Sequence, residues 1–198
     1  MNAVNQAWIS IGIASRPAAG ESVPVDIWQL AWSETHCRVA LIGRSHHGSI
    51  RANRGTTMIE ELAREPRLDP ARTVERILRS SDAVTETPLF VARIDAVTNS
   101  LTIAGLGPLT VSLCQNRVCR ELLDAQGIAG GTLGAVRQLE VGLDDDWMLV
   151  VQASVGSNAS DVRRILEMKR GMCPDMASLL ARVDSLAPGA SLLIAGPR

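Results

Sequence analysis

The sequence predicts an α+β fold. Short apolar segments with the alternation typical of strands occur in runs, whereas amphipathic helical segments come in pairs between those runs. Apolar residues make up 46% and charged residues 21% of the 198 residues, which is enough apolar material for a packed core. No apolar stretch approaches the ~20 residues that cross a bilayer. We therefore expect one globular domain over residues 1–198.

The first third of the chain is predicted to contain strands followed by two helices. A helical pattern runs from Ser49 to Glu65, and Pro70, at a first-turn position, begins a second helix through Ile77 toward Ser81. Turn-forming segments separate the strands before them. The predicted strands here are Ala7–Ala14, Val25–Trp32 and Cys37–Ile42.

The rest of the sequence predicts a long run of antiparallel strands, followed by two more helices and a last strand. The segment Asp95–Asn99 suits a hairpin turn and Gly105–Pro108 a tight turn. The later helices are predicted over Asp161–Lys169 and Asp175–Ser185. The predicted strands are Pro88–Ile94, Ser100–Ala104, Leu109–Leu113, Arg117–Leu123, Ala135–Val141, Trp147–Gln152 and Leu192–Ala195.

The net charge and the cysteine content limit which binding partners and which cellular compartment we expect. The formal net charge is −1, from 20 basic and 21 acidic residues, so we expect neither nucleic-acid nor membrane binding. The first residues show no signal-peptide pattern, which predicts a cytoplasmic protein with reduced thiols. Cys114 and Cys119 could face each other across a hairpin, but buried thiols are the favoured interpretation.

The pair His47-Gly48, the segments Leu89–Asp95 and Leu101–Gly107, and the segment Gly127–Gly131 follow one another along the chain. Their order and spacing resemble the PPM-type serine/threonine phosphatases (protein phosphatase 2C-like), above all the short bacterial SpoIIE-like and stressosome-phosphatase branch. The segments Leu89–Asp95 and Leu101–Gly107 resemble the central hairpin of that family. His47-Gly48 before a helix resembles the His-Gly pair that follows its first catalytic aspartate, and Gly127–Gly131 with Asp145, Asp146 and the strand after them resembles its next segment. The resemblance covers nearly the whole chain.

The resemblance implies a four-layer αββα sandwich, in which two antiparallel sheets are flanked by helix pairs. It also implies two manganese or magnesium ions, held between aspartates, that activate a water for attack on a phosphoserine or phosphothreonine. The metal positions of the family fall on Gly43, Ala153 and Gly189, and only Asp26 still offers a carboxylate. Since one carboxylate cannot hold two divalent ions, we expect no cofactor and no catalytic residue.

The resemblance therefore predicts a degenerate, non-catalytic relative that acts by binding a protein in a partner-switching or stress-signalling system. The expected partner is an anti-sigma-type kinase, its antagonist or a stressosome-like component. Arg44, with His47, Arg51 and Arg54 downstream, could hold a phosphate or an acidic group of that partner, or simply be a solvated helix start.

Two alternatives remain open. The chain could be an active manganese- or magnesium-dependent protein phosphatase with displaced ligands such as Asp26, Asp144 or Asp161. It could also be a scaffold subunit, for instance a homodimer.

Other patterns favour plain structural interpretations. Asp144, Asp145 and Asp146 are expected to form a solvated turn rather than a calcium site, because the alternating oxygen ligands of a calcium loop are missing. His36 and Cys37 are neighbours in a strand and so point to opposite faces, which argues against a catalytic thiol–imidazole pair. His36 could meet His46 and His47 at a metal, but no carboxylate nearby would complete the site.

Overall fold

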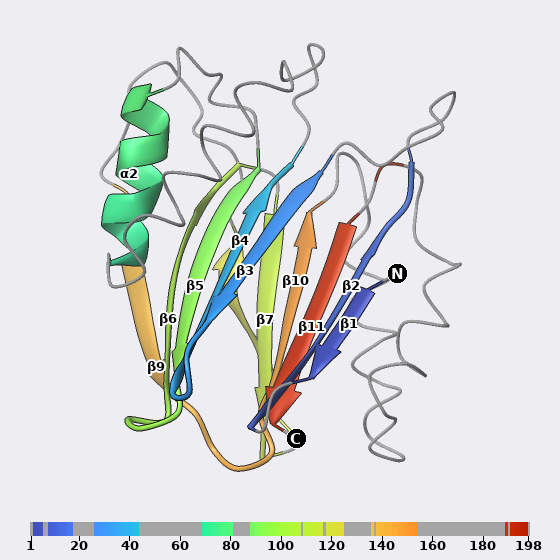
Figure 1. Cartoon of the computed structure of the whole chain (residues 1–198), viewed down its shortest axis with the longest axis vertical. Helices are drawn as coiled ribbons and strands as arrows, with labels where there is room; N and C mark the ends of the chain where they lie inside the picture. The colour runs from blue at the N-terminus through green and yellow to red at the C-terminus, as the bar shows by residue number, and fades with distance from the viewer. Residues whose placement is uncertain are drawn as a thin grey trace. The chain divides into compact units, whose positions relative to one another are not determined.

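The computed structural model of the chain contains two antiparallel β-sheets and one helix within its described residues (Figure 1). Those residues are 2–5, 8–17, 26–43, 69–80, 88–107, 109–116, 118–124, 136, 138–153, 189 and 191–197. The elements are β1 (Asn2–Asn5), β2 (Ile9–Ser15), β3 (Ile27–Trp32), β4 (His36–Ile42), α2 (Pro70–Ser80), β5 (Leu89–Asp95), β6 (Ser100–Leu106), β7 (Leu109–Gln115), β8 (Val118–Asp124), β9 (Gln138–Gly142), β10 (Met148–Ala153) and β11 (Ser191–Pro197).

Backbone contacts divide the chain into two compact units, each with its own sheet. The first comprises Met1–Val25, Thr110–Asp124 and Asp144–Arg198, and the second comprises Asp26–Leu109 and Ala125–Leu143. Both units are therefore assembled from separate stretches of sequence. The prediction of one domain over residues 1–198 stays a prediction.

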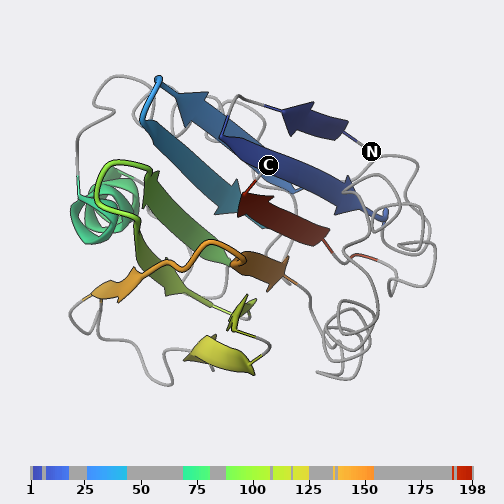
Figure 2. The same ribbon diagram turned by 90° about the horizontal axis from the view of Figure 1, so that it is seen from below.

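The sheet of the first unit has six strands in the order β1-β2-β11-β10-β7-β8. Figure 2 shows β1 beside β2 and β2 beside β11, as the register requires. Every residue of β10 is buried, and so is every residue of β11 except its last. Most residues of these two strands are apolar, as burial requires, and the exceptions Gln152 and Ser191 are buried polar residues.

The sheet of the second unit has five strands in the order β3-β4-β5-β6-β9. Between β5 and β6, the Asp95 carboxylate accepts the backbone N–H groups of Val97 and Thr98 at 2.8 and 3.1 Å. Asn99 completes the turn with a φ of 46°, in the left-handed region that asparagine tolerates. These bonds form the hairpin turn that the sequence predicts over Asp95–Asn99, and the two strands pair from Asp95↔Ser100 onward.

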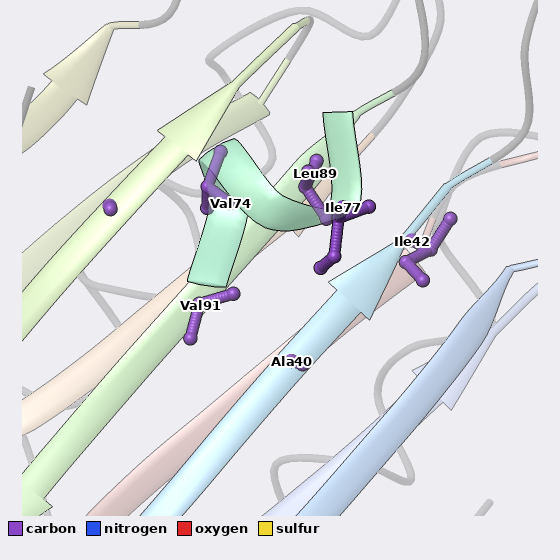
Figure 3. Packing of buried hydrophobic residues seen from close by; sticks show 7 residues of the cluster. Ala40, Ile42, Val74, Ile77, Leu89 and Val91 are labelled. Carbon is purple, nitrogen blue, oxygen red and sulfur yellow. The ribbon is translucent and has the colours of Figure 1, made fainter. Parts of the chain in front are cut away.

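One face of this sheet is covered by α2, through Val74 and Ile77. Both side chains are fully buried against Ala40, Ile42, Leu89, Val91 and Ala104, and Figure 3 shows how they meet the strand residues labelled there. Asp69 caps the helix, since its carboxylate accepts the N–H of Ala71 at 2.9 Å. Pro70 fills the first position, where no backbone donor is needed.

A buried hydrogen bond also joins α2 to β4. The Arg38 guanidinium, 6% exposed, donates from Nη2 to the Thr73 hydroxyl at 2.9 Å. Burial, together with the guanidinium of Arg93 on β5, lowers the pKa of Arg38. The arginine thus adds a directional contact to an otherwise apolar helix–sheet interface.

The predicted fold class is confirmed: the strands form two antiparallel sheets in an α+β chain. Each predicted strand is present within two or three residues of its expected ends, and α2 begins at Pro70 as predicted. The strand β1 was not predicted. The predicted helices Ser49–Glu65, Asp161–Lys169 and Asp175–Ser185 lie outside the described residues.

Candidate functional site

Asp26 and Gly43 lie side by side at one end of the β3–β4 pair. Ile27 pairs with Ile42 in the antiparallel register, so the residues that flank this pair are Asp26 before β3 and Gly43 after β4. Asp26 is half-buried, and Gly43 is buried. Two positions that the resemblance relates to metal binding therefore lie together. Asp26 carries a carboxylate and Gly43 does not.

The space beside Gly43 is closed by Pro88. The Gly43 N–H donates to the Pro88 carbonyl at 2.7 Å, which holds the two backbones together. A Cβ atom at position 43 would lie 2.9 Å from Pro88 Cγ, 3.1 Å from its Cβ and 3.2 Å from its Cδ. Because the pyrrolidine ring is rigid, an aspartate at position 43 requires the backbone to shift. Position 43 thus has no carboxylate and no room for a side chain unless the backbone shifts.

In the other unit, Ala153 and Gly189 lie at the ends of paired strands. Ala153 is 2% exposed at the end of β10 and pairs with Ser191 at the start of β11. Gly189, just before β11, has a φ of 80° and donates its N–H to the carbonyls of Arg16 and Pro17 at 3.0 and 3.2 Å. Since a side chain is strained at that φ, glycine suits this turn better than an aspartate would.

These four positions do not fit a two-metal centre. Two divalent cations need several anionic oxygen ligands, and Asp26 alone supplies a carboxylate here. Within the described ranges, no group of three or more His, Cys, Asp or Glu side chains is arranged to hold a metal ion. We therefore derive no catalytic step through a metal. Arg44, His47, Arg51 and Arg54 lie outside the described residues, so their role stays a prediction.

His36 and Cys37 point apart, as predicted for neighbours in a strand. His36 is exposed, and its Nε2 lies 3.0 Å from the Asp95 carboxylate while its Nδ1 lies 2.7 Å from the Thr35 hydroxyl. Cys37 is fully buried, and that burial raises the pKa of its thiol to about 12. A thiol that stays protonated at neutral pH is no nucleophile. His46 and His47, the other histidines considered for a metal site, lie outside the described residues.

Asp144, Asp145 and Asp146 form the exposed turn that was predicted between β9 and β10. The Asp146 carboxylate accepts the backbone N–H of Asn116 at 3.0 Å, and Asp144 accepts its side-chain amide. The turn therefore contacts the tip of the β7–β8 hairpin. The Asp144 carboxylate, considered as a displaced metal ligand, thus accepts a hydrogen bond from the Asn116 side chain.

The favoured interpretation of Cys114 and Cys119 as buried free thiols is wrong. The two residues are register partners across the β7–β8 hairpin, and their sulfurs form a disulfide. The spacing of five residues allows this pairing because the hairpin turn is short. Of the two, only Cys114 is buried.

Comparisons by sequence find no relative: no family model and no curated protein matches the chain. Comparisons by structure find chains with a similar fold. The chain is similar to RsbX in complex with magnesium, with a TM-score of 0.81 at 14% identity over 100% of this chain and 99% of RsbX. It is similar over 96% of its length to a protein of the bacterial stressosome, described as a modular system adapted to control secondary messenger signalling, with a TM-score of 0.74, 11% identity and 99% of that protein covered.

A third similar structure is the PP2C phosphatase domain of SpoIIE from Bacillus subtilis, with a fragment of its regulatory domain. The TM-score is 0.71 at 14% identity, and the match covers 96% of this chain and 63% of that one. The chain has the PPM-type phosphatase fold.

The PPM-type fold explains why the sequence phrases occur in their order. The segments that resemble the central hairpin of the family are β5 and β6, which pair in register from Leu89↔Leu106 to Asp95↔Ser100. At identities of 10–14%, the fold is shared although few residues are identical. No helix in the described part of the chain is long and apolar enough to cross a membrane.

Proposed function

We propose that the chain is a non-catalytic regulatory protein with the PPM-type fold, a pseudophosphatase that acts by binding a protein partner. The observation that carries the proposal is the closure of position 43 by Pro88, beside the single carboxylate of Asp26. Any side chain at position 43 would meet the Pro88 ring, so an aspartate there would require the backbone to shift. Binding is then the activity that the fold retains.

The proposed setting is a cytoplasmic partner-switching or stress-signalling system. RsbX and the stressosome protein are the similar structures that support this setting. The proposed partner is an anti-sigma-type kinase, its antagonist or a stressosome-like component. The near-neutral charge of −1 favours a protein partner over nucleic acid or an anionic membrane.

The proposed binding face begins where β4 ends. Arg44 directly follows Gly43, and His47, Arg51 and Arg54 follow within a few residues. Guanidinium groups bind phosphate and carboxylate through paired hydrogen bonds, so this segment suits a phosphorylated or acidic surface of the partner. We assign to this segment the binding of a phosphorylated or acidic group of the partner, without hydrolysis of a phosphate ester.

Metal titration and turnover test the loss of catalysis. The purified protein is expected to hydrolyse neither a generic phosphate ester nor a phosphoserine peptide in manganese or magnesium. Its melting temperature should not rise with either metal, since a ligand stabilises a protein only when it binds the folded state. Metal-dependent turnover that Asp26→Asn abolishes would instead establish the phosphatase with displaced ligands.

Peptide titration tests the binding face. A phosphoserine peptide is expected to bind more tightly than its unphosphorylated form, and Arg44→Ala should weaken binding by about tenfold, the size of one charge-assisted hydrogen bond. Arg79→Ala, an exposed arginine on α2, is the matched control and should leave affinity unchanged. Equal affinity of Arg44→Ala and the parent protein would rule out this face. Purification as a homo-oligomer without a partner would favour the scaffold alternative.

A further inference from the structure

The β7–β8 hairpin carries two cysteines that the proposed function does not use. Cys114 on β7 and Cys119 on β8 are direct register partners, with Cα atoms 4.0 Å apart, and their disulfide encloses little more than the turn. Cys114 is 2% exposed, whereas Cys119 is exposed. The disulfide therefore joins an exposed cysteine to a buried one.

The hairpin is held by contacts other than this bond. Backbone pairing extends from Thr110↔Asp124 to Gln115↔Val118. At the tip, Asn116 adopts a φ of 50° and is bonded by Asp144 and Asp146. A cross-link that closes so short a loop removes little entropy from the unfolded chain. The hairpin can therefore keep its register with two free thiols.

We propose that Cys114 and Cys119 form a reversible dithiol–disulfide pair that exchanges with low-molecular-weight thiols, and that Cys119 is the sulfur attacked first. Exposed disulfides are the ones that exchange readily with small thiols, and Cys119 is exposed. The inference rests on the hairpin alone and does not depend on the proposed function.

The exchange takes place in two steps. A thiolate of the glutathione type attacks Cys119 Sγ, the protein S–S bond breaks, and Cys114 leaves as a thiolate that takes up a proton. A second thiolate then attacks the small-molecule sulfur of the mixed disulfide and releases Cys119 as a thiol. One protein disulfide and two small thiols become two protein thiols and one small disulfide, and oxidation is the reverse reaction.

Equilibration of the folded full chain with glutathione tests the proposal. The protein, with Cys173→Ser to remove a competing thiol, is held at reduced-to-oxidised ratios from fully oxidising to fully reducing, then alkylated and analysed by mass spectrometry. We expect Cys114 and Cys119 to gain alkyl groups together at an intermediate ratio, while the far-UV circular dichroism spectrum stays unchanged. A disulfide that never forms, or that resists every ratio while the protein stays folded, would overturn the inference.

Two single variants test which sulfur exchanges. Cys114→Ser leaves Cys119 without its resolving partner, so a stable mixed disulfide with glutathione should accumulate on it. Cys119→Ser leaves only the buried Cys114, which should form that adduct at least tenfold more slowly. Equal rates in the two variants would contradict the assignment of Cys119 as the exchanging sulfur. Because both variants keep the hairpin contacts of Asn116, each should retain the parent circular dichroism spectrum.

Discussion

At the scale of single residues, Gly43 is decisive for the candidate site. The sequence alone indicated that the carboxylate of the family was missing there, but it gave no sign that Pro88, 45 positions away, occupies the space. That contact depends on the pairing of β4 with β5, which no local pattern encodes. The assignment of Gly43 to a metal position of the family stays a prediction, and its steric closure by Pro88 could not be predicted from the sequence.

We expect Gly43→Ala to destabilise the protein by about 1–3 kcal/mol, the usual cost of overpacking a filled site. Its new Cβ would lie 2.9 Å from Pro88 Cγ. Gly142→Ala is the matched control, because a Cβ there meets nothing within 4 Å, and it should be neutral or slightly stabilising. Urea denaturation measures both changes.

A double-mutant cycle identifies the cause. In a Pro88→Gly background, the cost of Gly43→Ala should largely disappear, because the ring atoms that it would meet are gone. If the cost persists in that background, Pro88 does not close the site.

Cys37 gives a second prediction at this scale, in alkaline solution. Its folded-state pKa is raised to about 12, whereas the thiol of an unfolded chain has a pKa of ~8.5. The folded state therefore binds the extra proton, so stability is fully present below about pH 8.5 and declines as pH rises toward 12. The slope from this one group is about 1.4 kcal/mol per pH unit.

The free energy of unfolding of the parent and of Cys37→Ala, measured from pH 7 to 11, tests this linkage. The difference between the two should be constant up to about pH 8.5 and shrink above it. Parallel curves over the whole range would mean that Cys37 does not control alkaline stability.

At the scale of elements, the sequence predicted what local rules determine. Proline at the first position fixed the start of α2, and Asp95 and Asn99 have the side chains that their turn requires. The pairing partners were not predictable in the same way. The strands β6 and β7 are consecutive and joined by a tight turn at Gly107, whose φ is 83°, yet they belong to different sheets. The sheet that a strand joins depends on which apolar faces can be buried together, and a local pattern does not encode this.

Packing of α2 on its sheet should contribute much of the stability of the second unit. Ile77→Ala removes a side chain that is 1% exposed between β4 and β5, and it should cost about 2–5 kcal/mol through lost burial and the cavity it leaves. Arg72→Ala, on the exposed face of the same helix, should change stability by less than about 0.5 kcal/mol. Equal effects of the two variants, compared by thermal unfolding, would show that α2 does not depend on this contact.

At the scale of the whole molecule, the two units are interleaved along the chain. The backbone passes from one unit to the other at Val25–Asp26, Leu109–Thr110, Asp124–Ala125 and Leu143–Asp144. Because each sheet joins stretches from distant parts of the chain, forming one sheet closes and restrains the loops that carry strands of the other. We therefore propose that the chain unfolds as one cooperative domain.

The four tryptophans allow a direct measurement of this cooperativity, because two lie in each unit. Trp8 and Trp147 belong to the first unit, and Trp28 and Trp32 to the second. A variant with Trp8→Phe and Trp147→Phe reports on the second unit alone, and one with Trp28→Phe and Trp32→Phe reports on the first. In each variant, the urea midpoint by fluorescence should coincide with the midpoint by far-UV circular dichroism, which follows both sheets. Because each comparison is made within one variant, any stability change from the substitutions cancels. Separate midpoints would mean that the sheets unfold independently and that the prediction of a single domain is wrong.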